Sequence, residues 1–141
     1  MKAYLDTSVI VPYFIPEPCT PVINRFVRGP DRSLIVSTLA AGEFASAISR
    51  LLRMNLLSQE NAVNRLTAFD GWLSTAIETI EIEAADVRLA GMFVRRLDLG
   101  LKMPDAIHAA VCRRHGLTLV TRDGRLDQAS QVLGISTEIP A

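Results

Sequence analysis

Cysteine is scarce in this sequence. Cys19 and Cys112 are the only two, and their spacing matches no metal-binding pattern and provides no disulfide framework. We interpret both as free, partly buried thiols. No cluster of cysteine and histidine points to zinc.

Long apolar runs are also absent. No segment offers the 18 or so consecutive apolar residues that span a bilayer, so we expect no membrane segment. The N-terminus has no basic leader, long apolar run or cleavage site, so we predict no signal peptide and expect the cytoplasm.

The chain has no excess charge of either sign, with 15 basic and 15 acidic residues. This balance does not by itself indicate nucleic-acid binding. Only Lys2 and Lys102 are lysines, and the other basic residues are arginines. Arginine suits two-pronged phosphate contacts, but genome composition explains the bias equally well.

Strand patterns alternate with helix patterns along the whole chain. With 141 residues and 49% hydrophobic content, the sequence predicts one domain over 1–141. The alternation is typical of an α/β domain with a mostly parallel sheet of four or five strands. Expected strands lie at 2–5, 33–37, 78–82, 117–121 and 136–139, and expected helices lie within 16–29, 38–57, 58–74, 83–100, 103–116 and 122–134.

Most acidic residues lie in polar contexts that favour solvent. Examples are Glu17, Glu60, Glu78, Glu81, Glu83, Asp86 and Asp98. Four others lie among small and apolar residues or at the end of a strand pattern: Asp6, Glu43, Asp105 and Asp123.

These four acids are predicted to converge. Asp6 and Asp123 follow strands, and the ligand crevice of an open α/β sheet lies beyond the strands' carboxyl ends. Asp105 begins a helix, and Glu43 lies in the first turns of another. Gathered carboxylates repel one another, and a hard divalent cation such as Mg²⁺ or Mn²⁺ resolves the repulsion.

Three of the four acids also have an ordinary structural explanation. Asp6 suits a helix cap, Asp105 a favourable first-turn acid, and Asp123 a turn before Gly124. Glu43 has no comparable alternative. Their joint placement at one rim therefore favours a metal site.

Three segments resemble the PIN-domain ribonucleases, in particular the VapC toxins of bacterial VapBC toxin–antitoxin modules. "YLDTSVIVPYF" resembles the family's opening strand, "STLAAGEFASAISRL" its helix-borne Glu, and "LKMPDAIHAAVCRRHGLTLVTRD" its later acidic block and strand end. The resemblance covers essentially the whole chain. It implies a PIN-like three-layer α/β/α fold.

The resemblance also assigns residues. Asp6, Glu43, Asp105 and Asp123 match the positions that hold Mg²⁺ or Mn²⁺. Supporting hydroxyls match at Thr7 or Ser8 and at Thr121. Asp127 lies near a further acid of some members, where we expect a surface or indirect role. Leu126 stands where the family often has an aromatic residue, which affects the expected loop shape.

The activity that the resemblance implies is metal-dependent endoribonuclease chemistry. Metal-activated water attacks a phosphodiester in line and leaves 5′-phosphate and 3′-hydroxyl ends. The resemblance also implies a homodimer, a higher toxin–antitoxin assembly, and a small cognate antitoxin whose tail covers the active site.

Several other residues have two interpretations each. Arg122 and Arg125 flank Asp123 and are our best candidates for RNA phosphates. His108 suits a packed or supporting role near the site, and Trp72 suits core or interface better than base stacking. The apolar run "PYFIPEP" and the residues Met54, Leu56 and Leu57 suit a dimer or antitoxin surface and ordinary core equally.

Alternative functions remain open at this point. A PIN nuclease that processes RNA without an antitoxin is hardly distinguishable by sequence. A haloacid-type phosphohydrolase requires a second Asp two residues after Asp6, where the chain has Ser8. A non-enzymatic binding module with a decayed site conflicts with four intact acids.

Overall fold

A five-stranded parallel sheet forms the centre of the molecule. The computed structural model describes all residues 1–141. The strands lie in the order β3-β2-β1-β4-β5, and every pairing is parallel. This confirms the predicted α/β class. Their bounds are β1 (Lys2–Leu5), β2 (Ser33–Ser37), β3 (Glu78–Ile80), β4 (Thr118–Val120) and β5 (Thr137–Glu138).

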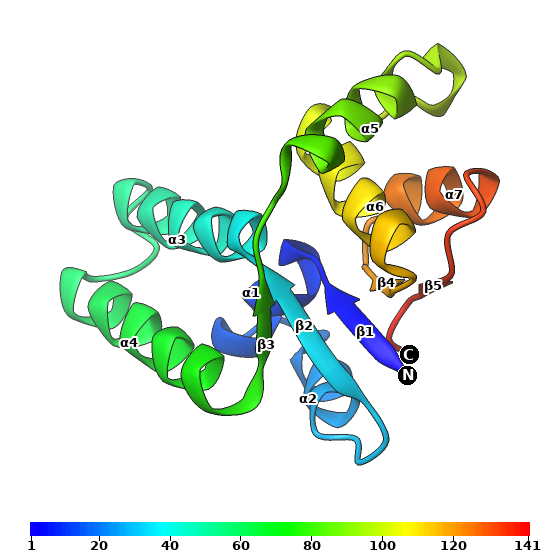
Figure 1. Ribbon diagram of the computed structural model, residues 1–141. Coiled ribbons are helices and arrows are strands. Elements are labelled where there is room, and N and C mark those ends of the chain that lie inside the picture. The colour runs from blue at the N-terminus through cyan, green and yellow to red at the C-terminus, as the bar shows by residue number, and fades with distance from the viewer.

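Seven α-helices cover the two faces of the sheet (Figure 1). Successive strand residues point to opposite faces, so Tyr4 packs with α5–α7 whereas Ala3 and Leu5 pack with α1–α4. The result is the predicted three-layer α/β/α arrangement. The helices are α1 (Thr7–Phe14), α2 (Thr20–Val27), α3 (Thr38–Arg53), α4 (Gln59–Ala76), α5 (Ala84–Val94), α6 (Met103–His115) and α7 (Gly124–Val132).

The carboxyl ends of β1, β2 and β4 meet at one edge of the sheet. The Asp6 amide donates to the Val120 carbonyl at 3.2 Å, which extends the β1–β4 pairing by one residue. Helices α1, α3 and α7 begin within a few residues of these strand ends. Their first turns and the strand ends therefore share one rim.

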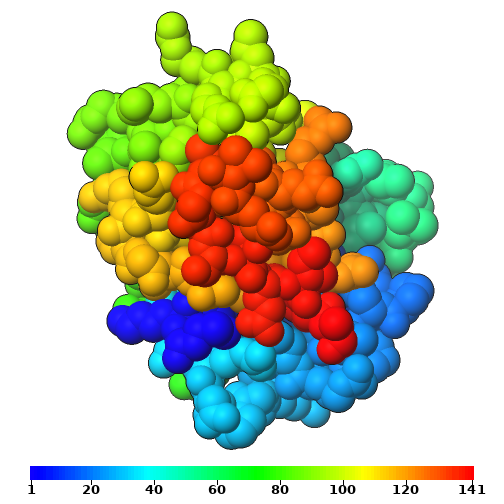
Figure 2. Space-filling view, turned by 90° about the vertical axis from the view of Figure 1, so that its right-hand side faces the viewer, coloured from blue at the N-terminus to red at the C-terminus, as the bar shows by residue number.

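In the view of Figure 1, the two chain ends are drawn close together near the start of β1. Figure 2 shows the blue N-terminal segment next to the red C-terminal segment. The red and orange surface of β5 and α7 forms the middle of this side of the molecule. The C-terminal strand β5 borders the loop after β4, because the Thr121 amide donates to the Glu138 carbonyl at 3.1 Å.

The helix predicted over 83–100 is shorter than expected. Helix α5 ends at Val94, and residues Leu97–Leu99 form a separate 3-10 turn, η1. The backbone of Arg96 is not helical (ψ 87°), so the helical hydrogen bonds stop there. Gly100 ends η1 in the left-handed region (φ 63°), which glycine adopts without steric cost.

The prediction that Asp86 faces solvent is wrong. Its side chain is fully buried and accepts a hydrogen bond from Arg114 of α6 at 2.6 Å. It also accepts from the Glu83 amide and so caps α5. The partner lies 28 residues away in the sequence, so local context gave no sign of it.

Both cysteines are free, as predicted. None of the seven α-helices combines the length and the apolar character that crossing a membrane requires.

Candidate active site

Asp6 lies where β1 ends and α1 begins. It caps α1, because one carboxylate oxygen, Oδ1, accepts from the Ser8 amide at 3.0 Å. The Ser8 hydroxyl donates to the same oxygen at 2.6 Å, and the Thr121 hydroxyl donates to Oδ2 at 2.6 Å. The capping explanation of Asp6 is therefore correct, but it accounts for only one of these three contacts.

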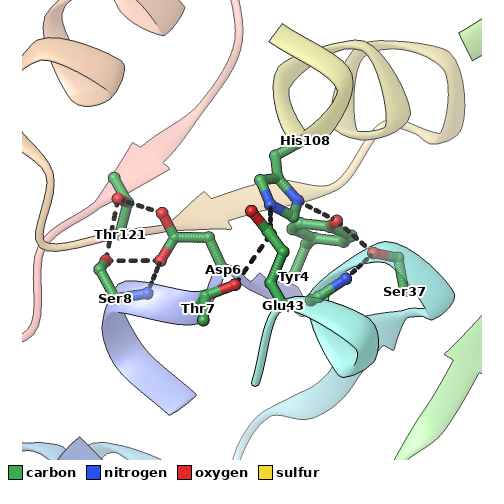
Figure 3. Close-up of polar contacts among 9 residues, drawn as sticks. Tyr4, Asp6, Thr7, Ser8, Ser37, Glu43, His108 and Thr121 are labelled. Carbon is green, nitrogen blue, oxygen red and sulfur yellow. Dashed lines mark hydrogen bonds and ion pairs between the residues drawn. The ribbon is translucent and has the colours of Figure 1, made fainter. Parts of the chain in front are cut away.

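The two hydroxyls are themselves held in place. Ser8 Oγ accepts from the Arg122 amide at 2.8 Å, and Thr121 Oγ1 accepts from the Asp123 amide at 3.0 Å. Because backbone donors occupy these oxygens, each hydroxyl hydrogen is directed at Asp6 (Figure 3). The loop after β4 thus fixes the carboxylate at the end of β1.

Burial dominates the electrostatics of Asp6. Its side chain is only 4% exposed. Burial raises the pKa of this carboxyl, although the hydrogen bonds from Ser8 and Thr121 act in the opposite direction. No Lys or Arg forms an ion pair with it.

Glu43 enters the site from the second turn of α3. Its Oε1 accepts from the Thr7 hydroxyl at 2.9 Å and lies 2.6 Å from His108 Nε2 (Figure 3). Burial raises the pKa of Glu43, but the contacts with His108 and Thr7 outweigh burial and lower it overall. The Thr7 hydroxyl therefore donates to Glu43, whereas the Ser8 hydroxyl donates to Asp6.

A buried polar chain lies behind Glu43. His108 Nδ1 lies 2.5 Å from the Tyr4 hydroxyl, which lies 2.6 Å from Ser37 Oγ. All three side chains are at least 98% buried. The histidine that we expected to pack near the site is thus linked to it by hydrogen bonds.

Asp105 differs from the other acids. It lies in the first turn of α6, is half-buried, and forms no hydrogen bond or ion pair in the structure. Burial raises the pKa of this carboxyl, and the negative charge of Asp123 raises it further. No Lys, Arg or His forms an ion pair with Asp105.

Asp123 caps α7. One of its oxygens, Oδ1, accepts from the amides of Arg125 and Leu126 at 3.0 and 3.2 Å. Oδ2 forms no hydrogen bond. The turn explanation of Asp123 is therefore also correct, and one oxygen stays available.

The four predicted acids line one small cavity of about 80 Å³. Every lining residue is polar: Asp6, Thr7, Ser8, Glu43, Asp105, His108 and Asp123. One enclosed water requires about 10–15 Å³ by a comparable measure. The cavity therefore has room for a cation together with water.

The donor set fits a hard, hydrated divalent cation. Oxygen ligands suit Mg²⁺ and Mn²⁺, and the charges of Asp105 and Asp123 lack any paired Lys or Arg. No three His, Cys, Asp or Glu side chains are arranged as a ready-made ligand shell. Mg²⁺ usually keeps several waters when it binds protein carboxylates.

Two arginines near the rim are exposed. The Arg122 side chain forms no hydrogen bond or ion pair, and the Arg125 side chain donates only to the Gly100 carbonyl at 3.5 Å. Arg125 also lines a hollow of about 230 Å³ with Lys102, Asp105 and Asp123. The Asp127 side chain accepts hydrogen bonds only from Gln131 and lies outside the carboxylate cavity.

The aromatic and apolar candidates divide between core and surface. Trp72 packs in a cluster with Tyr13, Phe14 and Phe69, which favours its core interpretation. Met54 and Leu56 are 52% and 64% exposed in the turn after α3. Pro16 and Pro18 are also exposed, whereas residues 13–15 and Leu57 are half-buried. The exposed members keep the character of a partner surface.

Sequence reasoning missed Tyr4 and Ser37. Tyr4 reads as a core strand residue and Ser37 as a helix cap, and Ser37 does cap α3 through the Ala40 amide. The one available signal is the polar hydroxyl that each places in an otherwise apolar strand.

The comparisons with known proteins agree with this geometry. A family model described as the PIN domain matches residues 3–132. A search by sequence among proteins with curated functions finds no match.

Solved structures resemble the chain in fold. DNA-bound VapBC from Salmonella typhimurium aligns with a TM-score of 0.74 at 18% identity, covering 100% of this chain and 99% of that one. VapC20 from Mycobacterium tuberculosis, a toxin that cleaves the sarcin–ricin loop, aligns with a TM-score of 0.72 at 22% identity. The alignment covers 90% of this chain and 94% of that one. FitAcB from Neisseria gonorrhoeae aligns with a TM-score of 0.69 at 17% identity, and the alignment covers 98% of this chain and 97% of that one.

Proposed function

The chain belongs to the PIN-domain family, and on that premise we propose that it is a Mg²⁺- or Mn²⁺-dependent endoribonuclease and the toxin of a VapBC-type module. The observation that carries the proposal is the cavity lined by Asp6, Glu43, Asp105 and Asp123, whose charges no Lys or Arg neutralises.

The proposed roles follow from the contacts of each carboxylate. Asp6 is fixed by two hydroxyls, and Glu43 presents an oxygen, Oε2, that forms no hydrogen bond. Asp105 has both oxygens free, and Asp123 has one. These four residues would hold the cation. When bound, a divalent cation stabilises charge on a phosphoryl oxygen and lowers the pKa of water, which assists in-line hydrolysis.

RNA is the proposed substrate. Support comes from the fold shared with VapC20, which cleaves the sarcin–ricin loop, and from the exposed arginines at the rim. Arg125 lines the hollow next to Asp105 and Asp123. It would pair with a phosphate beside the scissile bond, with Arg122 as a second phosphate contact.

The test is cleavage of RNA by the purified chain with Mg²⁺ or Mn²⁺, compared with the same reaction in EDTA. Asp6→Ala and Asp105→Ala are expected to abolish cleavage. Asp70→Ala, an exposed acid on α4, is the matched control and retains cleavage. Cleavage that persists in EDTA or in both site variants would refute the assignment.

A cognate antitoxin is the proposed partner. The solved complexes named VapBC and FitAB support this, since their fold matches along nearly the whole chain. Induction of the chain alone in a bacterial host is expected to stop growth, and co-expression of the neighbouring small gene product restores growth. If growth is normal without any partner while RNA cleavage persists in vitro, a processing nuclease without an antitoxin is favoured.

A homodimer, within a higher toxin–antitoxin assembly, is proposed in the cytoplasm. Support comes from exposed apolar side chains near the end of α5, where Met92 and Leu97 are 66% and 87% exposed. Met54 and Leu56 offer a second apolar patch on the other helical layer. Light scattering of the purified chain is expected to give a molar mass twice the chain mass of 15.4 kDa. Leu97→Glu is expected to reduce the measured mass to that of a single chain.

A further inference from the structure

Tyr4, Ser37 and His108 form one hydrogen-bonded chain that ends on a single oxygen of Glu43 (Figure 3). The four residues come from β1, the end of β2, α6 and α3. Tyr4, Ser37 and His108 are not carboxylates, and of these three only His108 lines the cavity. The chain is therefore a support that reaches the site from inside the core.

The side of the sheet on which Tyr4 lies explains how this chain forms. Tyr4 packs on the sheet face covered by α5–α7, whereas its neighbours Ala3 and Leu5 pack on the other face. Its hydroxyl therefore meets α6 at His108. One turn before His108, the same helix carries Asp105, so α6 contributes both a free carboxylate and the support for another.

Counting hydrogens gives the chain a direction. Ser37 Oγ accepts from the Ala40 amide at 3.1 Å, so its hydroxyl hydrogen is free to donate to Tyr4. Tyr4 then donates to His108 Nδ1, which leaves the hydrogen of a neutral imidazole on Nε2, directed at Glu43. Every group is satisfied in this arrangement. The reverse direction leaves the Ser37 hydrogen without an acceptor.

This direction determines what Glu43 does. Oε1 receives hydrogens from both His108 and Thr7, so the carboxylate is held in one orientation from two sides. Oε2 receives none. Supports of this kind around metal ligands typically change metal affinity 10- to 100-fold when removed.

We propose that His108, itself held by Tyr4 and Ser37, is a positioning residue that orients Glu43 for the cation. This inference rests on the proposed function, because it assigns a purpose to Glu43 within that metal site. It predicts that His108 acts on cation affinity only through Glu43.

The experiment is Mn²⁺ titration of the full-length chain by isothermal calorimetry. His108→Ala and His108→Phe both remove the donor, and each is expected to weaken Mn²⁺ binding about 10-fold. His108→Gln keeps an N–H at a similar reach and is expected to stay within about threefold of the unsubstituted chain. His115→Ala, on the exposed end of the same helix, is the matched control with unchanged affinity.

A double-substitution cycle separates positioning from general loss of structure. Glu43→Gln weakens Mn²⁺ binding, and adding His108→Ala to it is expected to cause no further loss. Tyr4→Phe keeps the ring and removes only the hydroxyl, and it is expected to weaken binding by about threefold, again only when Glu43 is present. It also provides the test if the His108 variants do not fold.

The outcomes divide cleanly. Unchanged affinity in the folded His108 variants, or an equal loss with and without Glu43, overturns this inference and leaves the nuclease proposal intact. If the unsubstituted chain binds no Mn²⁺, the nuclease proposal fails and this inference fails with it.

Discussion

Asp6 and Asp105 line the same cavity but are built in opposite ways. Asp6 is 4% exposed and accepts hydrogen bonds from two hydroxyls and a backbone amide. Asp105 is half-buried and accepts none. Burial raises the pKa of both, but at Asp105 the neighbouring charge of Asp123 adds to the effect, whereas at Asp6 hydrogen bonds oppose it.

This difference separates two duties of a site carboxylate. Asp6 ties β1, α1 and the loop after β4 together, so it belongs to the framework of the fold as well as to the proposed metal site. Asp105 contributes nothing visible to the framework. Its half-buried carboxylate carries a charge without an ion-pair partner, and a bound cation would compensate this charge.

The largest expected effect is on cleavage, where the two residues behave alike. Asp6→Asn and Asp105→Asn each remove a cation ligand and are expected to lower the RNA cleavage rate by about 100-fold or more. Single-turnover rates at saturating Mg²⁺ measure this. Full activity in Asp105→Asn would contradict the proposed role of Asp105 as a cation ligand.

Cation binding is expected to stabilise the fold through the cavity. At 100 times its dissociation constant, Mn²⁺ adds about 2.7 kcal/mol to the free energy of unfolding. If Asp105→Asn weakens binding tenfold or more, the same concentration adds less than about 1.5 kcal/mol. Urea unfolding with and without Mn²⁺ measures both. An equal gain in the two proteins would show that the cation binds elsewhere.

Stability without metal is expected to separate the two residues. Asp6→Ala removes the cap of α1 and leaves two hydroxyl donors without their acceptor, which costs about 2 kcal/mol. Asp105→Ala breaks no hydrogen bond and relieves repulsion, so the free energy of unfolding is expected to stay level or rise by a few tenths of a kcal/mol. Urea unfolding in EDTA decides this, and equal destabilisation would contradict the contrast.

The smallest expected effect is on pH dependence in EDTA. A carboxyl whose pKa is raised in the folded state binds protons better there than in the unfolded chain. The stability contributed by Asp6 and Asp105 is therefore present at low pH and is lost as pH rises through the raised pKa.

Asp105→Asn removes the titrating carboxyl, so the part of the stability loss that Asp105 causes at rising pH disappears. The free energy of unfolding of the unsubstituted chain is expected to fall relative to Asp105→Asn by a few tenths of a kcal/mol as pH rises from 4 to 7, because solvent screens a half-exposed group. Parallel curves for the two proteins would contradict the assigned pKa direction of Asp105.

The convergence of the four acids was predictable because it depends on chain order. Acids that follow parallel strands, or begin the next helix, must share the carboxyl edge of the sheet. The structure brings Asp6, Glu43, Asp105 and Asp123 to one cavity there. Their roles in catalysis stay predictions. The sequence left Met54, Leu56 and Leu57 open between core and surface, and in the structure Met54 and Leu56 are exposed whereas Leu57 is half-buried.

Contacts between distant elements were not predictable. The Tyr4–His108 contact joins residues 104 positions apart and depends on which face of the sheet Tyr4 occupies. The burial of Asp86 depends on Arg114 in another helix. The early end of α5 arises at Arg96, a residue type that favours helices, so only the three-dimensional context ends the helix there.

The most direct measurement is X-ray diffraction from Mn²⁺-soaked crystals at a wavelength that reveals manganese. The account predicts an anomalous peak in the cavity, at about 2.1–2.2 Å from oxygens of at least Asp6 and Asp105. Asp105→Asn crystals are expected to show the peak weakened or absent. A cavity without manganese, in crystals that bind it at another site, would contradict the account.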